Sequence, residues 1–213
     1  AMGHTRLAIV DLIGSAQPLF GPAGEVLVVN GEIYNHQSLR TQHSQYRWTT
    51  QGDSESILSL LHSAKSKSNG VLSAGQHAKW LNRLNGMYAI ALWDEGAKQL
   101  ILARDPMGIK PLVRTHVDGS LLFASETKAL RAHESYVPAI DELALIARIA
   151  WEYPLDGTTL FKDVVQVRPG TVEVWCLDHE GRPYLHDSAV IERQFVEPSA
   201  SWNPDANAAS LLE

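Results

Sequence analysis

Four short strings carry the residues whose types and spacing could do chemistry in this sequence. They are GHTRLAIVD over 3–11, NGEIYN over 30–35, GDSE over 52–55 and RDPMGIKPL over 104–112. The first three each place a charged or amide side chain at a predicted strand edge or helix start, where rigid elements can aim it into a pocket. We therefore look for a site among these strings.

The signatures of the common enzyme classes are missing. The sequence contains no G-x-S-x-G elbow, no G-x-x-x-x-G-K loop, no G-x-G-x-x-G, no C-x-x-C and no H-E-x-x-H. Its single cysteine, Cys176, excludes an internal disulfide framework and a cysteine-based zinc site. We expect no metal, and a reducing cytoplasm is the simplest setting.

Composition indicates a globular domain. The chain has 213 residues, of which 45% are hydrophobic and 20% charged, enough for one domain with a real core. The net charge of −6 argues against a nucleic acid or an anionic membrane surface as partner. No apolar run approaches the ~18 residues that a membrane-spanning helix needs.

Hydrophobic periodicity predicts a mixture of strands and helices, which points to α+β layers rather than alternating βαβ units. The helix after Asp53-Ser54-Glu55 has a clear start signal, and Asp118-Gly119 is typical of a two-residue hairpin turn. The predicted strands are 6–11, 26–30, 87–94, 99–104, 112–117 and 120–124, with a final hairpin of 164–167 and 171–177 around Arg168-Pro169-Gly170. The predicted helices are one from 53, one that carries Trp80, Leu81 and Leu84 and ends at Gly86, 127–133, and 141–151 with Leu145, Ile146 and Ile149 on one face.

The strings together are specific to a family. With LNGMYAIALWD over 84–94, FASETKAL over 123–130 and TLFKD over 159–163, the sequence resembles the glutaminase domain of class II glutamine amidotransferases. The most similar branch is the glutamine-hydrolysing asparagine synthetase family, and NGEIYN is the discriminating string. The resemblance runs from about His4 to about Leu177. It implies an incomplete four-layer α/β/β/α sandwich of the N-terminal-nucleophile hydrolase type.

The resemblance also implies roles for five residues. Arg6 matches the arginine that binds the α-carboxylate of glutamine, for which a planar guanidinium is well suited. Asp53 matches the carboxylate that holds the α-ammonium, and Glu32 matches a second acidic contact. Asn30 and the backbone N–H of Gly31 match the oxyanion hole, where one donor is typically worth about 3 to 4 kcal/mol in the transition state.

Simpler structural roles compete with these assignments. Asp53 also fits a helix N-cap, and the two roles can coexist. Asn30-Gly31 could form a turn, and Glu32 could be a solvated charge. Arg104, Asp105 and Lys110 are expected to organise the polar interior and an interface rather than to touch substrate. An unrelated hydrolase built on His4, His36 or His62 has no nucleophile motif to support it.

The nucleophile of the resembling family is missing from this sequence. That family uses an N-terminal cysteine whose own α-amino group is the base, whereas this chain begins with Ala1 and has no cysteine before Cys176. Cys176 is expected to be a small buried hydrophobe. We therefore interpret 1–3 as the scar of a cleaved tag, 4–178 as a truncated glutaminase domain and 179–213 as a linker or tail toward an absent ATP-dependent synthetase domain.

The expected parent protein hydrolyses glutamine to glutamate and uses the ammonia to amidate an ATP-activated carboxylate such as aspartate. ATP and Mg would belong to the absent synthetase domain, with no cofactor in this chain. The expected partners are glutamine and that domain, and a homodimer is left open. Pro106 and Arg114 depart from the branch's usual arginine and tyrosine, which weakens the case for aspartate. The alternative is a non-catalytic glutamine-binding or scaffolding domain.

Overall fold

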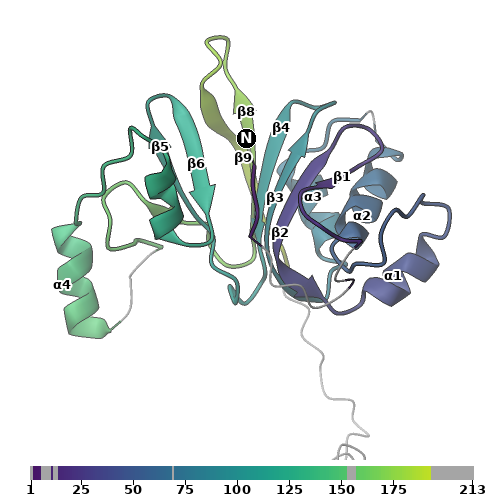
Figure 1. Cartoon of the computed structure of the whole chain (residues 1–213), viewed down its shortest axis with the longest axis horizontal. Helices are drawn as coiled ribbons and strands as arrows, with labels where there is room; N and C mark the ends of the chain where they lie inside the picture. The colour runs from purple at the N-terminus through teal and green to yellow at the C-terminus, as the bar shows by residue number, and fades with distance from the viewer. Residues whose placement is uncertain (1, 6–10, 12–13, 69, 153–156, 193–213) are drawn as a thin grey trace, which may run out of the picture.

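The computed structural model describes residues 2–5, 11, 14–68, 70–152 and 157–192 (Figure 1). It contains two sheets in which every strand pair is antiparallel. The larger sheet has the order β1-β2-β3-β4-β8-β9, and the smaller has the order β6-β5-β7. The larger sheet comprises β1 Leu19–Phe20, β2 Val26–Ile33, β3 Gly86–Asp94, β4 Gln99–Arg104, β8 Thr171–Leu177 and β9 Pro183–Val190; the smaller comprises β5 Val113–Val117, β6 Ser120–Ala124 and β7 Val165–Gln166. The helices are α1 His36–Gln42, α2 Glu55–Lys65, α3 Ala74–Leu81 and α4 Glu142–Trp151, with a 3-10 helix, η1, over Thr127–Ala132.

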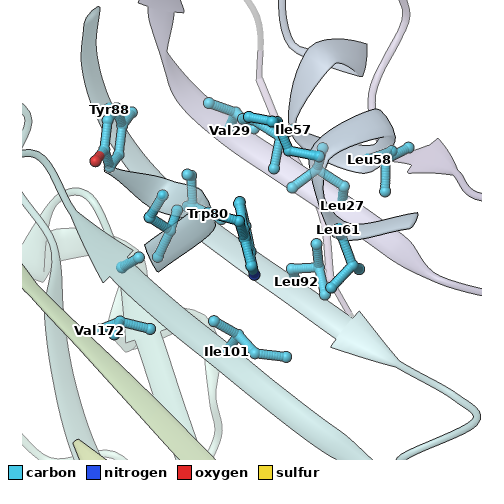
Figure 2. Close-up of a cluster of buried hydrophobic side chains, with 14 of the residues drawn as sticks. Leu27, Val29, Ile57, Leu58, Leu61, Trp80, Tyr88, Leu92, Ile101 and Val172 are labelled. Carbon is cyan, nitrogen blue, oxygen red and sulfur yellow. The ribbon is translucent and has the colours of Figure 1, made fainter. Parts of the chain in front are cut away.

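The two faces of the larger sheet bury different layers. Along β3, Tyr88, Ile90 and Leu92 pack with side chains of α2 and α3 (Figure 2), whereas Ala89 and Ala91 pack toward the smaller sheet. This alternation is the period-2 geometry of a strand buried on both faces. Helices α1 to α3 thus cover one face and the smaller sheet covers the other, with η1 and α4 beyond it (Figure 1).

The local start and turn signals are confirmed. Helix α2 begins at Glu55, the last residue of the predicted start signal Asp53-Ser54-Glu55. Asp118 and Gly119 have φ values of 47° and 71° and connect β5 to β6, with Val117 opposite Ser120. Such positive φ at both turn positions matches the right-handed twist of the two strands. The strand predicted over 6–11 lies, except for Asp11, outside the described residues.

The predicted end of the second helix is wrong. Helix α3 begins with a capping box between Ser73 and Gln76 and ends at Leu81, so Leu84 lies outside it. Gly86 is the first residue of β3, opposite Ile33. A Cβ on Gly86 would lie 3.0 Å from the Cα of Ile33, so this glycine permits two strands to approach rather than ending a helix.

The predicted final hairpin is also wrong, because its two strands lie in different sheets. β7 pairs with β5, and β8 pairs with β4 and β9. Arg104 holds the connection in place: its guanidinium donates to the carbonyls of Val167, Gly108 and Lys110 at 2.7 to 2.9 Å. A segment that looks like a turn therefore crosses from one sheet to the other.

Two expectations for the second half of the chain change, and helix α4 shows an unexpected exposure. Residues 183–190 form β9, paired along β8, where we expected a linker or tail. Cys176 is partly exposed, because it lies near the end of β8, so the expectation of a buried cysteine is wrong. The apolar residues of α4 are largely exposed, since only Ala144 is buried in that helix.

An ion pair joins the two sheets. Arg114 on β5 donates from Nε to Oε2 of Glu173 on β8 at 2.7 Å, and its guanidinium lies 4.9 Å from the ring centroid of Trp175. The Trp175 indole donates to the same Glu173 oxygen at 3.0 Å. Arg114, a departure from the usual residue of the resembling branch, thus has a structural partner in this fold.

A buried ionic cluster joins the end of α2 to the larger sheet. Lys65, the last residue of α2, donates to both carboxylate oxygens of Asp94 at 2.8 Å and to Glu25 at 3.3 Å. Burial lowers the pKa of the Lys65 ammonium, but the hydrogen bonds and charges of Asp94 and Glu25 outweigh burial and raise it. Lys65 therefore stays charged and compensates two carboxylates, each about 3% exposed.

None of the helices in the described ranges is long and apolar enough to cross a membrane.

Candidate functional site

The second half of β2 carries three of the predicted site residues in succession. Asn30 and Glu32 alternate with the buried Val29 and Ile33, so their side chains lie on the face of the sheet opposite the helices. Asn30 is half-buried, and its Nδ2 donates to Oγ of Ser125, which follows β6, at 3.0 Å. This bond crosses from the larger sheet to the smaller one, and an amide nitrogen has a second N–H left to donate.

The backbone N–H of Gly31 points away from β3. Tyr88, opposite Gly31, directs both its N–H and its carbonyl to Asp105. Paired residues in an antiparallel ladder either exchange both bonds or neither, so Gly31 also turns its polar groups away from Tyr88. They point to the outer edge of β2, beyond the reach of β1, which pairs only as far as Leu27.

Side chains close that edge on both sides of Gly31. Gln17 accepts from the Val29 N–H at 2.6 Å and donates to the Val29 carbonyl at 3.0 Å, as a neighbouring strand would. Asp53 accepts from the Ile33 N–H at 2.8 Å. In the part of the chain that the structure describes, the Gly31 N–H has no such acceptor. One strand therefore offers an open backbone donor directly beside the Asn30 amide.

We expect Gly31→Ala to lower the free energy of unfolding by about 2 to 3 kcal/mol, as overpacking does. The added Cβ would meet the carbonyl of Met87 and would lie 2.7 Å from the Cα of Tyr88, so β2 and β3 would have to separate. Urea denaturation measures the loss. Gly75→Ala in α3 is the control, because its Cβ would meet only Oγ of Ser73, at 3.9 Å; equal stability of the two variants would contradict the prediction.

Asp53 ties the start of α2 to the end of β2. Its carboxylate accepts the Ile33 N–H instead of capping the helix, and the residue at the N-cap position, Ser54, makes no side-chain cap. The expectation of a side-chain N-cap is therefore wrong. The Asp53 carbonyl accepts from the N–H and Oγ of Ser56 at 3.1 and 2.6 Å. These bonds fix a buried carboxylate next to β2.

The side chain of Glu32 makes no hydrogen bond or ion pair among the described residues. It is half-buried, and its two oxygens can therefore accept hydrogen bonds from a positively charged group of a ligand. Arg6, the predicted carboxylate-binding residue, lies outside the described residues.

A small cavity lies between the two sheets beside Asn30. Its volume is about 90 Å³. Asn30 and Ser125 face it together with Gly3, His4 and Phe123. A larger cavity of about 790 Å³ lies elsewhere between the sheets, lined mainly by apolar side chains such as Val26, Trp93, Leu121 and Trp175. Of the predicted site residues that the structure describes, none lines this larger cavity, so the smaller one is the better candidate.

Two positioning residues, Gln17 and Ser125, were missed by the sequence analysis. Ser125 lies within the FASETKAL string, so its motif was found but not its role. Gln17 stands outside every string quoted above, and nothing in the sequence indicates that its amide replaces a strand.

Asp105 acts as expected in the polar interior: it accepts from the N–H groups of Met107, Ile109 and Lys110 at 2.9 to 3.1 Å.

No group of three or more His, Cys, Asp or Glu side chains in the described ranges is arranged to hold a metal ion.

The sequence is similar to a known family and to curated proteins. The chain matches the family described as "Glutamine amidotransferase domain" over residues 1–185. It is 38% identical over 183 residues to a putative glutamine-hydrolysing asparagine synthetase of Mycobacterium tuberculosis strain H37Rv, covering 79% of this chain and 26% of that protein. It is 39% identical over 132 residues to asparagine synthetase B of Escherichia coli K12, covering 61% and 22%. The chain thus spans about a quarter of the length of these curated relatives.

Solved structures show the same fold. The chain superposes on glutamine phosphoribosylpyrophosphate amidotransferase from B. subtilis with a TM-score of 0.55 and 22% identity, covering 84% of this chain and 32% of that one. A second structure, of an allosteric regulatory enzyme of purine biosynthesis, gives a TM-score of 0.57 and 20% identity, covering 85% and 32%. The predicted layered α+β sandwich is confirmed.

Proposed function

The chain belongs to the family of glutamine amidotransferase domains, and from this we propose that it is the glutaminase half of a glutamine-dependent, asparagine synthetase-like amidotransferase. The observation that carries the proposal is the pair of donors on β2. The Asn30 amide and the outward Gly31 N–H lie side by side on one rigid strand. Donors fixed in this way stabilise the oxyanion of amide hydrolysis without reorganising during the reaction.

The remaining site residues bind the α-carbon end of glutamine. Glu32 offers an unpaired carboxylate to the α-ammonium, and Asp53 adds a second carboxylate that the Ile33 N–H orients. Arg6 binds the α-carboxylate through its planar guanidinium. Glutamine held at this end presents its side-chain amide to Asn30 and Gly31, so that hydrolysis yields glutamate and ammonia.

The chain as given is proposed to bind glutamine without hydrolysing it. In the family that the chain resembles, a cysteine thiol activated by an adjacent base attacks the amide carbon. The only cysteine, Cys176, lies on β8, whereas the donor pair lies on β2, and β3 and β4 separate these strands. In the parent protein the nucleophile would be an N-terminal cysteine with its own α-amine as base.

The rest of the parent protein supplies the second reaction. The ammonia would amidate a carboxylate, such as that of aspartate, that ATP and Mg have activated in a synthetase domain. The curated relatives, named as asparagine synthetases and about four times as long as the matched region, support this division. The protein would act in the cytoplasm. A non-catalytic glutamine-binding domain is the second candidate, favoured by the position of Cys176.

Glutamate release tests the proposal. We expect the product of the full gene to release glutamate from glutamine, and the purified 213-residue chain to release none. If the full product binds glutamine in titration calorimetry but is inactive, the non-catalytic domain is the correct function. If neither protein binds glutamine, both candidate functions are wrong.

A further inference from the structure

Helix α4 carries an apolar face that nothing in the described fold covers. Leu143, Ile146 and Ile149 follow each other at a spacing of three, which places them on one side of the helix. They are 80%, 62% and 75% exposed. We call these three residues the α4 face. Figure 1 shows α4 standing apart from both sheets.

Among the described residues, the hydrogen bonds that hold helix α4 to the rest of the fold lie at its start. Asp141 caps it through a bond from the Ala144 N–H at 3.0 Å. The backbone before the helix bonds to the segment that precedes β7, from Lys162 N–H to the Ala139 carbonyl and from Asp141 N–H to the Leu160 carbonyl. A helix of ten residues is marginal in water unless an apolar face packs on something. Docking on another surface would supply that packing.

We propose that the α4 face is the contact surface for the synthetase-like remainder of the parent chain. This inference rests on the proposed function, which assigns the chain to a longer protein. About three-quarters of the length of the curated relatives lies outside the region that this chain matches. The described chain ends just after β9, on the lower side of the sandwich in Figure 1, and α4 lies on that side too.

The size of the face favours a tethered partner over a second copy of the chain. Three aliphatic side chains offer on the order of 300 Å² of surface, well below the ~800 Å² per partner of a stable association between separate molecules. A domain on the same chain is held at an effective concentration of roughly millimolar. A small apolar contact is therefore sufficient within one chain, whereas it is insufficient between two.

Hydrogen exchange in the full-length protein tests this. We expect the α4 amides to exchange at least about ten-fold more slowly in the full gene product than in the 213-residue chain. The double variant Ile146→Glu/Ile149→Glu should abolish that difference, because both side chains are exposed and the substitutions leave the fold intact. Val71→Glu is the matched control: Val71 is 59% exposed, before α3, and its variant should keep the protection.

The outcomes separate this inference from the proposed function. If the full gene product releases glutamate but its α4 amides exchange as fast as those of the 213-residue chain, the docking surface is overturned and the proposed function is unaffected. Slowed α4 exchange in a protein without glutaminase activity supports the surface and contradicts the function. If light scattering shows that the 213-residue chain is a dimer, and Ile146→Glu separates it into monomers, the α4 face binds a second copy of the chain and the inference is overturned. A gene that encodes nothing beyond this chain overturns it as well.

Discussion

If the full-length protein is the proposed amidotransferase, Asn30→Ala is expected to lower its kcat for glutamine hydrolysis by about 100- to 1,000-fold, the usual effect of removing one oxyanion donor. The loss should fall on kcat rather than on KM, because charge develops on the amide oxygen only in the transition state. Steady-state glutamate release measures both constants. A raised KM with an unchanged kcat would show instead that Asn30 only holds the ground-state substrate.

Ser125→Ala provides the graded control for this prediction. Ser125 accepts from the Asn30 amide at 3.0 Å and so orients it. Its removal should lower kcat less than the loss of Asn30 itself, and Ser125→Thr, which keeps the hydroxyl, should restore most of the activity. Combining Ser125→Ala with Asn30→Ala should add little to Asn30→Ala alone, since the serine works through the amide.

Lys65→Met is expected to lower the free energy of unfolding by about 3 to 5 kcal/mol, the cost of leaving buried charges without their partner. Asp94 and Glu25 are each about 3% exposed, and Lys65 contacts both. Urea denaturation of the 213-residue chain measures the loss. Methionine keeps the volume of the side chain, so the change reports the charge rather than a cavity.

Two further variants make the Lys65 prediction specific. Lys79→Met removes an exposed lysine from α3 and should change stability by less than about 0.5 kcal/mol. Lys65→Met/Asp94→Asn should be more stable than Lys65→Met, because one of the uncompensated charges is gone. If Lys65→Met costs no more than Lys79→Met, the cluster does not stabilise the fold.

Sequence patterns predicted the parts of the fold that depend on neighbours along the chain. The start of α2 lies at Asp53-Ser54-Glu55 as predicted, and the β5–β6 turn follows from the positive φ that Asp118-Gly119 tolerates. The same local logic failed at Arg168-Pro169-Gly170. Those residues are typical of a turn, but the guanidinium of Arg104, far away in sequence, directs the chain into the other sheet.

The site divides in the same way. The sequence by itself determined the residue types, with Asn30, Gly31 and Glu32 in one string and Asp53 in another. Only the tertiary structure decided that the Gly31 N–H is open, because this depends on Tyr88 bonding to Asp105 on one side and on Gln17 and Asp53 closing the strand edge on the other. Residue identity sets which bonds a group can make, but whether a donor is already used depends on partners brought near it by the fold. A strand's free hydrogen bonds are therefore decided by long-range pairing, which no local pattern encodes.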